Sequence, residues 1–510
     1  MSDPHRAPHL EGDVTRLLPA LNRRRWVEFA WLVLAAALLP LHCTYAREFP
    51  PEVPPPKPFV MPAPALRVLP NGLKVIVVER HSLPLVTLRL VVRSGAESDP
   101  PNLPGTAQLV SSVLSEGTER RSAFQIAEAI DSAGGMLDTG ADWDSSYASL
   151  SVLRDHEEMA FDLLADMVIH PAFAPAEVER MRKQTLSALE IARDDPAYIA
   201  DTTLRRVLLA GTPYGHPEDG VPESVRRLTA QHLREFHRRH YRPDNCILAV
   251  VGDITAAEAF DRTAKYFGQW RREHTESASL PVGAQKPAHR VVVIDKPDAV
   301  QTEIRIGELG VKQSSDDFYA LSVANQIIGG PAENRLFKAL RSQQGLTYGA
   351  SSDLVCLETL GTWVAKTFTR TSGTVKSIHT ALEQMKRLRD HTLDDRDLET
   401  AKSYLIGHLA LEFETSENTA SRFLELMIHD LPLDYWNRFP ERIRAVTPQQ
   451  VSEVVRKYLD PDRSVIILVG NYSGFGKDAK KLDAETVIPL EDVDFGSPSL
   501  ERKPRTAGKP

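Results

Sequence analysis

The chain contains two copies of one sequence pattern, a little over two hundred residues apart. Two strand-like runs at 74–90 recur at 290–306, an offset of 216 residues (290 minus 74). A helix, a Pro-Asp turn and an apolar strand at 228–253 align without a gap on 446–471, an offset of 218 (446 minus 228). Two chance similarities would not be expected at nearly the same offset, so the pattern indicates an internal duplication. The repeat is too long for a solenoid unit and predicts two homologous domains in tandem.

Each copy opens with strands, continues through several amphipathic helices and closes with a helix, a turn and an apolar strand. Strands neither alternate regularly with helices nor dominate, which predicts an α+β fold of helices packed on mostly antiparallel sheets. We expect an N-terminal domain at 66–268, a polar linker at 269–289 and a C-terminal domain at 290–475. The last segment, 476–510, is charged and poor in apolar residues, so we expect it not to fold.

The composition is that of a soluble globular protein. The 510 residues are 42% hydrophobic and 25% charged, with a net charge of -8, and the basic clusters are short, so no nucleic acid is expected as a partner. Of three cysteines, Cys43 lies near the N-terminus, where the adjacent His42 disfavours a lipoprotein box. Cys246 and Cys356 lie in expected strands of different halves. Two such thiols are more often small buried apolar side chains than a disulfide or a metal site.

The N-terminus has the pattern of a secretory signal. Three arginines at 23–25 precede an apolar run at 29–41, and the segment 44–46 then offers a small residue before a possible cleavage site. Because a membrane-spanning helix needs roughly 20 apolar residues, we expect residues 1–46 to direct export to the bacterial periplasm. An uncleaved anchor in the inner membrane is the alternative. The proline-rich stretch at 47–65 predicts an extended tether between this segment and the globular body.

The stretch at 330–349 predicts a loop, a helix and a strand that bring two polar side chains together. Apolar residues at helical spacing are followed by Gly345 at the expected helix end, and Tyr348 begins a run suited to a strand. Arg341 and Tyr348 could therefore converge on one carbonyl oxygen, as stabilisation of an oxyanion by fixed donors requires. Each residue also has an ordinary interpretation, because arginine near a helix end usually faces solvent and tyrosine in a strand is usually half-buried.

The segment N-R-L-F-x-x-L-R-x-x-x-G-L-x-Y at 334–348 resembles the C-terminal half of the insulinase-like, or M16, zinc peptidases and their mitochondrial-processing-peptidase relatives. In that family an arginine and a tyrosine at this spacing form an R/Y pair that holds the substrate and polarises its scissile carbonyl. Arg341 and Tyr348 match those two positions. The resemblance extends over most of the chain and implies two α/β-roll domains per subunit, in dimers that close around the substrate.

The resemblance also implies a zinc motif, and here the chain departs from the family. M16 peptidases carry H-x-x-E-H on a helix, where two histidines one turn apart bind zinc and the glutamate acts as base on the metal-bound water. Residues 105–118 match the surrounding pattern G-x-A-H-x-x-E-H-x-x-x-x-G-T, but Gln108, Ser111 and Ser112 replace His, Glu and His. A neutral amide and two hydroxyls are poor zinc ligands.

The family's third zinc ligand is also missing. The glutamate expected further along the chain would fall at or near Ala188. Glu190 is close, but two residues along a helix turn by roughly 200° around its axis. The histidines His232, His237 and His240 share one amphipathic helix without a glutamate at metalloprotease spacing, so we expect no rebuilt site. The two motif serines lack a His-Asp setting and are not expected to be nucleophiles. No cofactor is therefore expected on this chain.

The leading hypothesis is a non-zinc subunit of an exported, heterodimeric M16-type zinc peptidase. A partner carrying H-x-x-E-H would bind the zinc, and this chain, inactive alone, would supply Arg341 and Tyr348. What favours this division is that the zinc motif has lost every functional position, whereas the R/Y motif keeps both. The alternative is a catalytically inactive structural or peptide-binding protein. A free-standing hydrolase with a rebuilt site ranks last.

The expected substrate is a peptide or an unfolded polypeptide. By resemblance, M16 chambers pair a peptide with an edge strand through backbone hydrogen bonds. Residues 137–141, directly after Gly134-Gly135 and Met136, occupy the matching position in this chain. The resemblance therefore implies that this segment is the edge strand of the N-terminal domain to which a peptide could pair.

Overall fold

The structure, a computed structural model, describes residues 60–272, 289–331, 334–390, 393–482 and 484–502. The predicted signal or anchor at 1–46, most of the tether at 47–65 and most of the linker at 269–289 lie outside these residues. Within the described ranges, no helix is both long enough and apolar enough to cross a membrane. All described residues belong to one structural unit, Pro58–Pro510.

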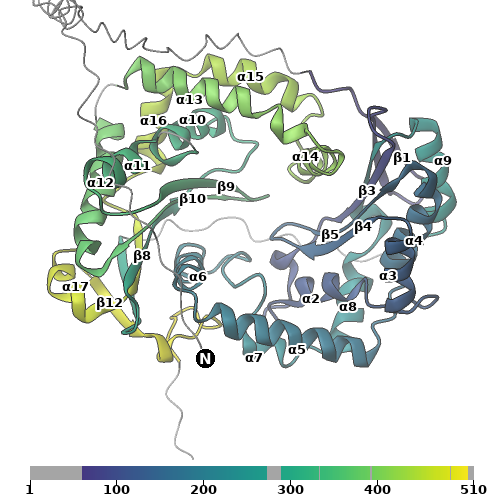
Figure 1. Cartoon of the computed structure of the whole chain (residues 1–510), viewed down its shortest axis with the longest axis horizontal. Helices are drawn as coiled ribbons and strands as arrows, with labels where there is room; N and C mark the ends of the chain where they lie inside the picture. Colours follow the sequence, from purple (N-terminus) through teal and green to yellow (C-terminus); the bar gives the residue numbers. More distant parts are fainter. Residues whose placement is uncertain (1–59, 273–288, 332–333, 391–392, 483, 503–510) are drawn as a thin grey trace, which may run out of the picture. The chain divides into compact units, whose positions relative to one another are not determined.

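The N-terminal half is built on a six-stranded sheet, called sheet 1 here (Figure 1). Its strands, in spatial order, are β1 (Ala65–Val68), β2 (Lys74–Glu79), β6 (Cys246–Gly252), β3 (Leu85–Val92), β5 (Ser146–Leu153) and β4 (Met136–Ala141). Only β2 and β6 run parallel, and the other neighbours are antiparallel. The segment predicted to bind peptide lies in β4, which is an edge strand of this sheet.

The C-terminal half repeats this arrangement in sheet 2. Its strands, in spatial order, are β12 (Ala484–Pro489), β7 (Arg290–Asp295), β11 (Val465–Gly470), β8 (Gln301–Leu309), β10 (Gly361–Arg370) and β9 (Ala350–Cys356). The order β7-β11-β8-β10-β9 reproduces β2-β6-β3-β5-β4, and the parallel pair β7-β11 corresponds to β2-β6. The added edge strands differ, because β12 runs parallel to β7 whereas β1 runs antiparallel to β2. Lys74 lies opposite Ile247, and Arg290 lies opposite Val465. The internal repeat in the sequence is thus a repeat of strand order and register, and the predicted α+β class is confirmed.

Helices of each half surround these sheets. Those of the N-terminal half are α2 (Thr106–Val113), α3 (Ala123–Ser132), α4 (Glu157–Ile169), α5 (Pro175–Ala192), α6 (Pro196–Leu208), α7 (Pro222–Val225), α8 (Ala230–His240) and α9 (Ala256–Phe267). Those of the C-terminal half are α10 (Phe318–Gly329), α11 (Arg335–Phe337), α12 (Thr374–Asp390), α13 (Asp395–His408), α14 (Ser416–Ile428), α15 (Tyr435–Ala445), α16 (Pro448–Tyr458) and α17 (Tyr472–Ala479). The repeated helices α8 and α16 both begin at a threonine whose hydroxyl accepts a backbone N–H, Thr229 and Thr447.

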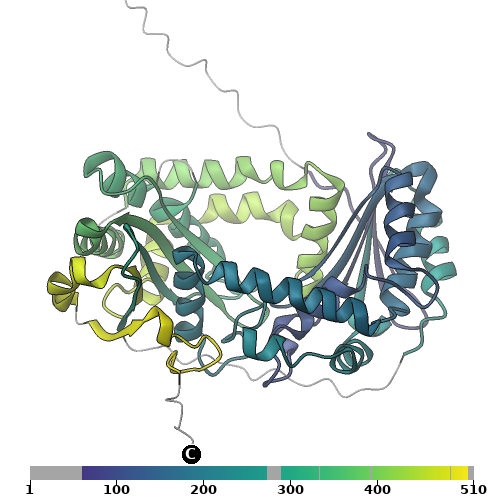
Figure 2. The same ribbon diagram turned by 60° about the horizontal axis from the view of Figure 1, so that its bottom comes forward.

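Each half also covers one face of the other half's sheet with a helix. α6 packs on β8 and β11 of sheet 2, and α14 packs on β3 and β6 of sheet 1 (Figures 1 and 2). Successive side chains of a strand point to opposite faces, so Val75 and Val77 of β2 join a core of the N-terminal half, whereas Ile76 and Val78 join the cluster that contains Phe423 of α14. The two halves therefore share hydrophobic cores, and neither buries its sheet with its own helices alone.

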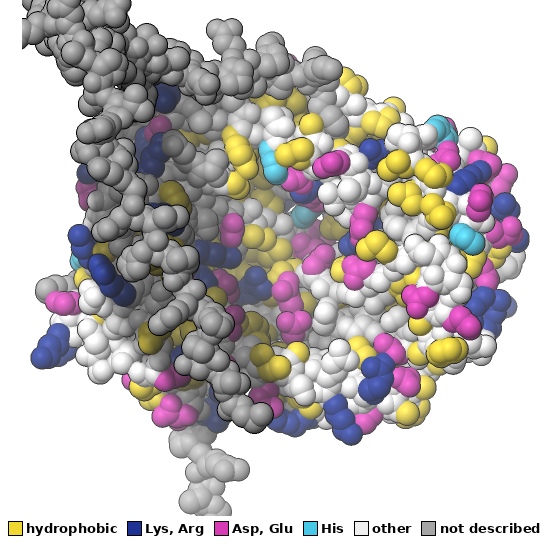
Figure 3. All heavy atoms as spheres, in the orientation of Figure 1, with side chains coloured by type: hydrophobic (Ala, Val, Ile, Leu, Met, Phe, Trp, Pro, Cys, Tyr) yellow, Lys and Arg dark blue, Asp and Glu magenta, His cyan; other side chains and the backbone are white. Residues whose placement is uncertain are grey.

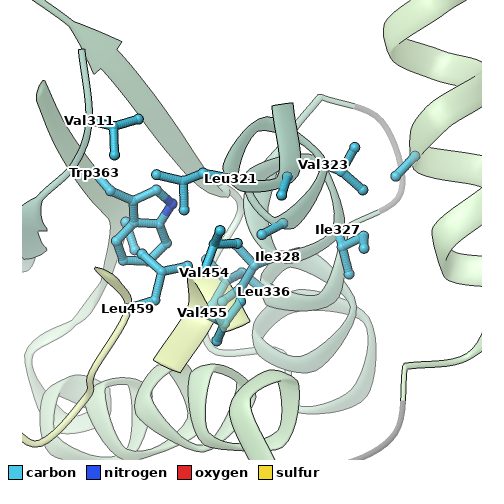
Figure 4. Packing of buried hydrophobic residues seen from close by; sticks show 14 of the residues in the cluster. Val311, Leu321, Val323, Ile327, Ile328, Leu336, Trp363, Val454, Val455 and Leu459 are labelled. Atoms are coloured by element: carbon cyan, nitrogen blue, oxygen red, sulfur yellow. The ribbon is translucent and has the colours of Figure 1, made fainter. Parts of the chain in front are cut away.

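The core of the C-terminal half is centred on Trp363 of β10 (Figure 4). The Trp363 side chain is fully buried, and its indole N–H donates to Oδ1 of Asn325, 2.9 Å away. Leu321 of α10 and Val454 and Leu459 from α16 and its end lie around the ring. A buried tryptophan needs a partner for its N–H, and Asn325 on α10 supplies it where that helix crosses the sheet.

The prediction that 476–510 does not fold is wrong for its described part. β12 pairs in parallel with β7 and forms an edge of sheet 2. Apolar side chains of β12 and of the residues after it are buried in the cluster that contains residues of α6: Ile488, Val493, Phe495 and Leu500. The tail is ordered here because β7 offers a strand edge for pairing and α6 offers an apolar surface for packing. A few apolar side chains of the tail are therefore enough to hold it in place. Residues 503–510 lie outside the described part of the chain.

Both described cysteines are free thiols. Cys246 is buried in β6 and Cys356 is half-buried at the end of β9. On the face seen in Figure 3, acidic and basic side chains are interspersed. This mixture is in keeping with the small net charge for the chain's length.

Candidate functional site

The helix that carries the zinc-motif positions, α2, begins at Gly105. This glycine has a φ of 91°, and a Cβ here would lie 2.7 Å from the backbone oxygen of Asp219, so other residues are disfavoured. The buried Asp99 carboxylate accepts the N–H groups of Gly105 and Ala107 at 2.6 and 2.7 Å. These bonds satisfy the first amides of the helix and hold its start in place.

Gln108 and Ser112 lie one turn apart on α2, and both are engaged in hydrogen bonds within the chain. Oε1 of Gln108 accepts the N–H of Ala141, at the end of β4, at 3.0 Å. The Ser112 hydroxyl donates to the backbone oxygen of Gln108 at 2.8 Å. The amide in the place of the first histidine therefore ties α2 to the edge strand.

The other positions of the zinc motif are equally unsuited to a metal. The buried Ser111 hydroxyl lies 3.3 Å from the Tyr241 hydroxyl, and burial raises the pKa of Tyr241 to about 12, so both groups stay neutral. Ala188 is exposed on α5 and has no ligating atom, and Glu190 is also exposed. In the part of the chain that the structure describes, no group of three or more His, Cys, Asp and Glu residues could hold a metal ion. The residues present do not fit zinc.

The three histidines of α8 have separate partners and do not converge. Nε2 of His237 lies 2.8 Å from the backbone oxygen of Val168, and Nδ1 of His240 lies 2.8 Å from the Ser94 hydroxyl. Burial lowers the pKa of each of these two imidazoles to about 4. Nδ1 of His232 is buried without a hydrogen-bond partner among the described residues. These side chains are core and capping residues of the fold.

Arg341 lies in a π-helical turn that directly follows the short helix α11. Oδ1 of Asn334 accepts the N–H of Phe337 at 2.7 Å and starts α11. The chain continues as a π-helical turn over Lys338–Gln343, a form often found at functional sites. Gly345, with a φ of 61°, ends the helical stretch as the sequence predicts.

Tyr348 lies in a loop, two residues before β9, and does not open the strand as predicted. The Thr347 hydroxyl explains the delay, because it accepts the N–H of Gly349 at 3.1 Å and donates to the oxygen of the same residue at 2.8 Å. This local turn uses backbone groups that a strand would otherwise pair. Tyr348 is consequently 76% exposed instead of half-buried.

Arg341 and Tyr348 nevertheless lie together. Nη1 of Arg341 donates to the backbone oxygen of Tyr348 at 2.9 Å. The centre of the guanidinium lies 5.6 Å from the Tyr348 ring centroid and 5.4 Å from that of Phe337. Among the described residues, Arg341 donates only this hydrogen bond, so other N–H groups of its guanidinium can reach a ligand.

An open pocket of about 350 Å³ adjoins the pair. It is lined by Gln301, Arg341, Gly345, Leu346, Thr347, Tyr348, Phe368, Thr369 and Arg370. Sequence reasoning missed Gln301, Phe368 and Arg370, which come from β8 and β10. The register of these strands places Arg370 directly opposite Gln301, and no spacing in the sequence reveals this neighbour relation.

Two family models match the chain and together cover most of its described part. The model described as insulinase (peptidase family M16) matches residues 74–217, and the model described as peptidase M16 inactive domain matches residues 227–405. The chain belongs to the M16 peptidase family. The first match lies within the N-terminal half, and the second begins near the end of that half and continues into the C-terminal half. The predicted family is confirmed.

Relatives and solved structures extend the M16 assignment over most of the chain. An uncharacterized zinc protease, YmxG, of Bacillus subtilis is 25% identical over 69% of this chain and 85% of its own length. A protein called non-peptidase homolog YmxG of Helicobacter pylori is 22% identical over 78% and 91%. The crystal structure of a peptidase M16 inactive domain from Pseudomonas fluorescens matches with a TM-score of 0.75 and 27% identity, over 80% of this chain and 97% of that one.

Proposed function

We propose that this chain is the zinc-free subunit of an exported two-chain M16 peptidase, to which it contributes Arg341 and Tyr348. The observation that carries the proposal is a contrast within one chain. Arg341 and Tyr348 lie together on an open pocket, while the zinc-motif positions hold Gln108, Ser111 and Ser112, each of which makes a side-chain hydrogen bond within the chain.

The chemistry assigned to this chain is binding and polarisation of a peptide carbonyl. A partner subunit with H-x-x-E-H would supply zinc and the attacking water. The Arg341 guanidinium would hold the substrate carbonyl, and the exposed Tyr348 hydroxyl would donate a hydrogen bond to the oxygen as negative charge develops there. Donors fixed in place before the reaction stabilise the transition state more than the ground state.

The names of two matches support inactivity of the isolated chain. The Helicobacter pylori relative is called a non-peptidase homolog, and the Pseudomonas fluorescens structure is called an inactive domain. The match of residues 227–405 to the inactive-domain model points the same way. Other relatives are called zinc proteases, and that wording belongs to those proteins.

The alternative is a catalytically inactive structural or peptide-binding protein. The observation that favours it is β4, an edge strand in which residues 137–141 could pair with an extended peptide. Such a protein needs no R/Y pair, so the exposure of Tyr348 at a pocket weighs against it. A neighbouring gene for an M16 homologue with H-x-x-E-H would favour the two-chain peptidase, and its absence would favour the alternative.

Mixing purified chains tests the proposal. Alone, this chain should bind no stoichiometric zinc and cleave no peptide, because its motif offers an amide, two hydroxyls and a methyl group as ligands. Combined with an M16 homologue that carries H-x-x-E-H, it should form a stable complex, and peptidase activity should appear only in the mixture. Elemental analysis that finds one zinc per isolated chain, with chelator-sensitive cleavage, contradicts the proposal. A stable but inactive complex supports the structural alternative.

We also propose that the protein is exported, on the basis of the basic and apolar pattern within residues 1–46. Cell fractionation of the native host, followed by immunoblotting, should find the chain in the periplasmic or inner-membrane fraction. N-terminal sequencing then separates the cleaved form from the anchored one, since only cleavage removes residues 23–41. Recovery of the full-length chain in the cytosol would rule export out.

A further inference from the structure

The face of sheet 2 that carries Arg370 has basic side chains that are ion-paired and others that are not. Arg305 of β8 donates to Asp201 and to Glu303, each at 2.7 Å, and Lys366 of β10 lies 2.9 Å from Asp353. Lys366 stands directly opposite Arg305 in the register, so these two cations share one face and are both neutralised there.

Arg370 lies on the same face of sheet 2 but has no acidic partner among the described residues. It lies four residues beyond Lys366 on β10, and alternate residues of a strand point to the same side. Among the residues that the structure describes, neither Arg370 nor Arg341 has an ion-pair partner, whereas Arg305 and Lys366 each have two. Both unpaired guanidinium groups line the pocket.

The pocket wall is suited to an anion that belongs to a peptide. Its lining contains two arginines and no aspartate or glutamate. Gln301 lies directly opposite Arg370 and adds a neutral amide, while Phe368 and Tyr348 add aromatic surface. Arginine binds carboxylates through paired N–H donors, and the aromatic rings can pack against the carbon atoms of a neighbouring side chain.

We infer that this pocket binds a carboxylate of the peptide substrate, with Arg370 as the residue that determines a preference for acidic peptides. The inference rests on the proposed function, because it places a substrate of that peptidase beside Arg341 and Tyr348. The carboxylate belongs either to an aspartate or glutamate side chain or to the C-terminus of the peptide. Arg341 contacts the carbonyl in this arrangement, and Arg370 contacts the carboxylate.

Binding to the full-length chain alone tests this without any partner subunit. The probes are fluorescein-labelled decapeptides with an amidated C-terminus and a single glutamate, each matched by a peptide with glutamine in its place. A second kind of pair is neutral in its side chains and differs only in a free or amidated C-terminus. Fluorescence anisotropy should show that the wild-type chain binds one carboxylate form roughly threefold to tenfold more tightly than its neutral match, as expected for a partly exposed ion pair with good geometry.

Arg370→Met should abolish this preference and leave the affinity for the neutral peptides unchanged. Arg370→Lys should keep part of it, because the charge remains while the paired donors are lost. Arg444→Met is the matched control, since Arg444 is an exposed arginine of α15 that does not line the pocket. Equal binding of the charged and neutral peptides by the wild-type chain, or a preference that survives in Arg370→Met, would overturn the inference. Comparison of the glutamate/glutamine pairs with the free/amidated pair tells whether the pocket takes a side-chain or a terminal carboxylate.

The outcome is independent of the mixing experiment. A preference that depends on Arg370 in a chain that never supports cleavage leaves the carboxylate site standing and removes the peptidase role. An active mixture whose kcat/KM is the same for glutamate and glutamine peptides, and for peptides with a free and an amidated C-terminus, in wild type and in Arg370→Met, removes the carboxylate site and leaves the peptidase role standing.

Discussion

Tyr348→Phe should lower kcat of the two-chain mixture by about a hundredfold to a thousandfold, equivalent to roughly 2.7–4 kcal/mol. The phenol hydroxyl is the group expected to donate to the developing oxyanion, and loss of a donor that acts in the transition state falls on kcat. The substitution spares the Arg341 contact, which goes to the backbone oxygen of Tyr348. Steady-state kinetics with a fixed peptide measure the change.

Arg341→Ala should slow turnover as well, with an additional rise in KM. Its guanidinium both holds the substrate in the proposed arrangement and fixes the loop through the 2.9 Å contact to Tyr348. Because the two residues are in contact, the double variant should lose less activity than the product of the two single losses. Zinc content and assembly of the mixture should not change in any of these variants.

Tyr472→Phe provides the matched control for loss of a tyrosine hydroxyl. Tyr472 begins α17 and does not line the pocket. If Tyr348→Phe and Arg341→Ala both left the mixture fully active, the R/Y assignment would be wrong. The chain would then be better explained as a structural subunit.

Arg305→Met should destabilise the fold by about 1–3 kcal/mol, because the arginine is buried whereas its partner Asp201 is 42% exposed and stays hydrated. Arg305 is only 4% exposed, and it bonds Asp201 of α6 and Glu303 of its own strand, each at 2.7 Å. Burial alone would lower the pKa of Arg305, but these two carboxylates outweigh it and raise the pKa. Without the guanidinium, Glu303 would lose its ion pair with Arg305, and Asp201 would keep only its longer contact to Lys366, at 3.8 Å. Thermal and urea unfolding of the purified chain measure the effect.

Lys366→Met is the control on the same face of sheet 2. Lys366 pairs with Asp353 at 2.9 Å, but its side chain is 37% exposed, and exposed ion pairs contribute about 1 kcal/mol or less. A loss of stability from Arg305→Met no larger than that from Lys366→Met would contradict a stabilising role for the buried pair. Because Asp201 belongs to the N-terminal half, Arg305→Met should also make α6 more susceptible to limited proteolysis.

Much of the fold could be predicted from the sequence, because an internal repeat is visible in the order and spacing of the residues along the chain. The two offsets predicted two copies of one sheet, and the strands pair in the same order in both. The sequence could not predict that α6 packs on sheet 2 and α14 on sheet 1. An amphipathic pattern shows which face of a helix is apolar but not which sheet that face will cover. The tail was mispredicted for a related reason: its few apolar residues suffice only because α6 and β7 already offer a surface.

The sequence by itself determined the family, the loss of every zinc-ligand position and the spacing of Arg341 and Tyr348, because each of these is a local pattern of residue types. Only the tertiary structure decided that Tyr348 precedes its strand and stays exposed, and that Gln301 and Arg370 stand beside it. These neighbours come from β8 and β10, and they meet through hydrogen bonding between strands far apart in the chain. The sequence shows which segments can form strands. Which residues then lie opposite one another in distant strands depends on how the whole sheet packs against its helices.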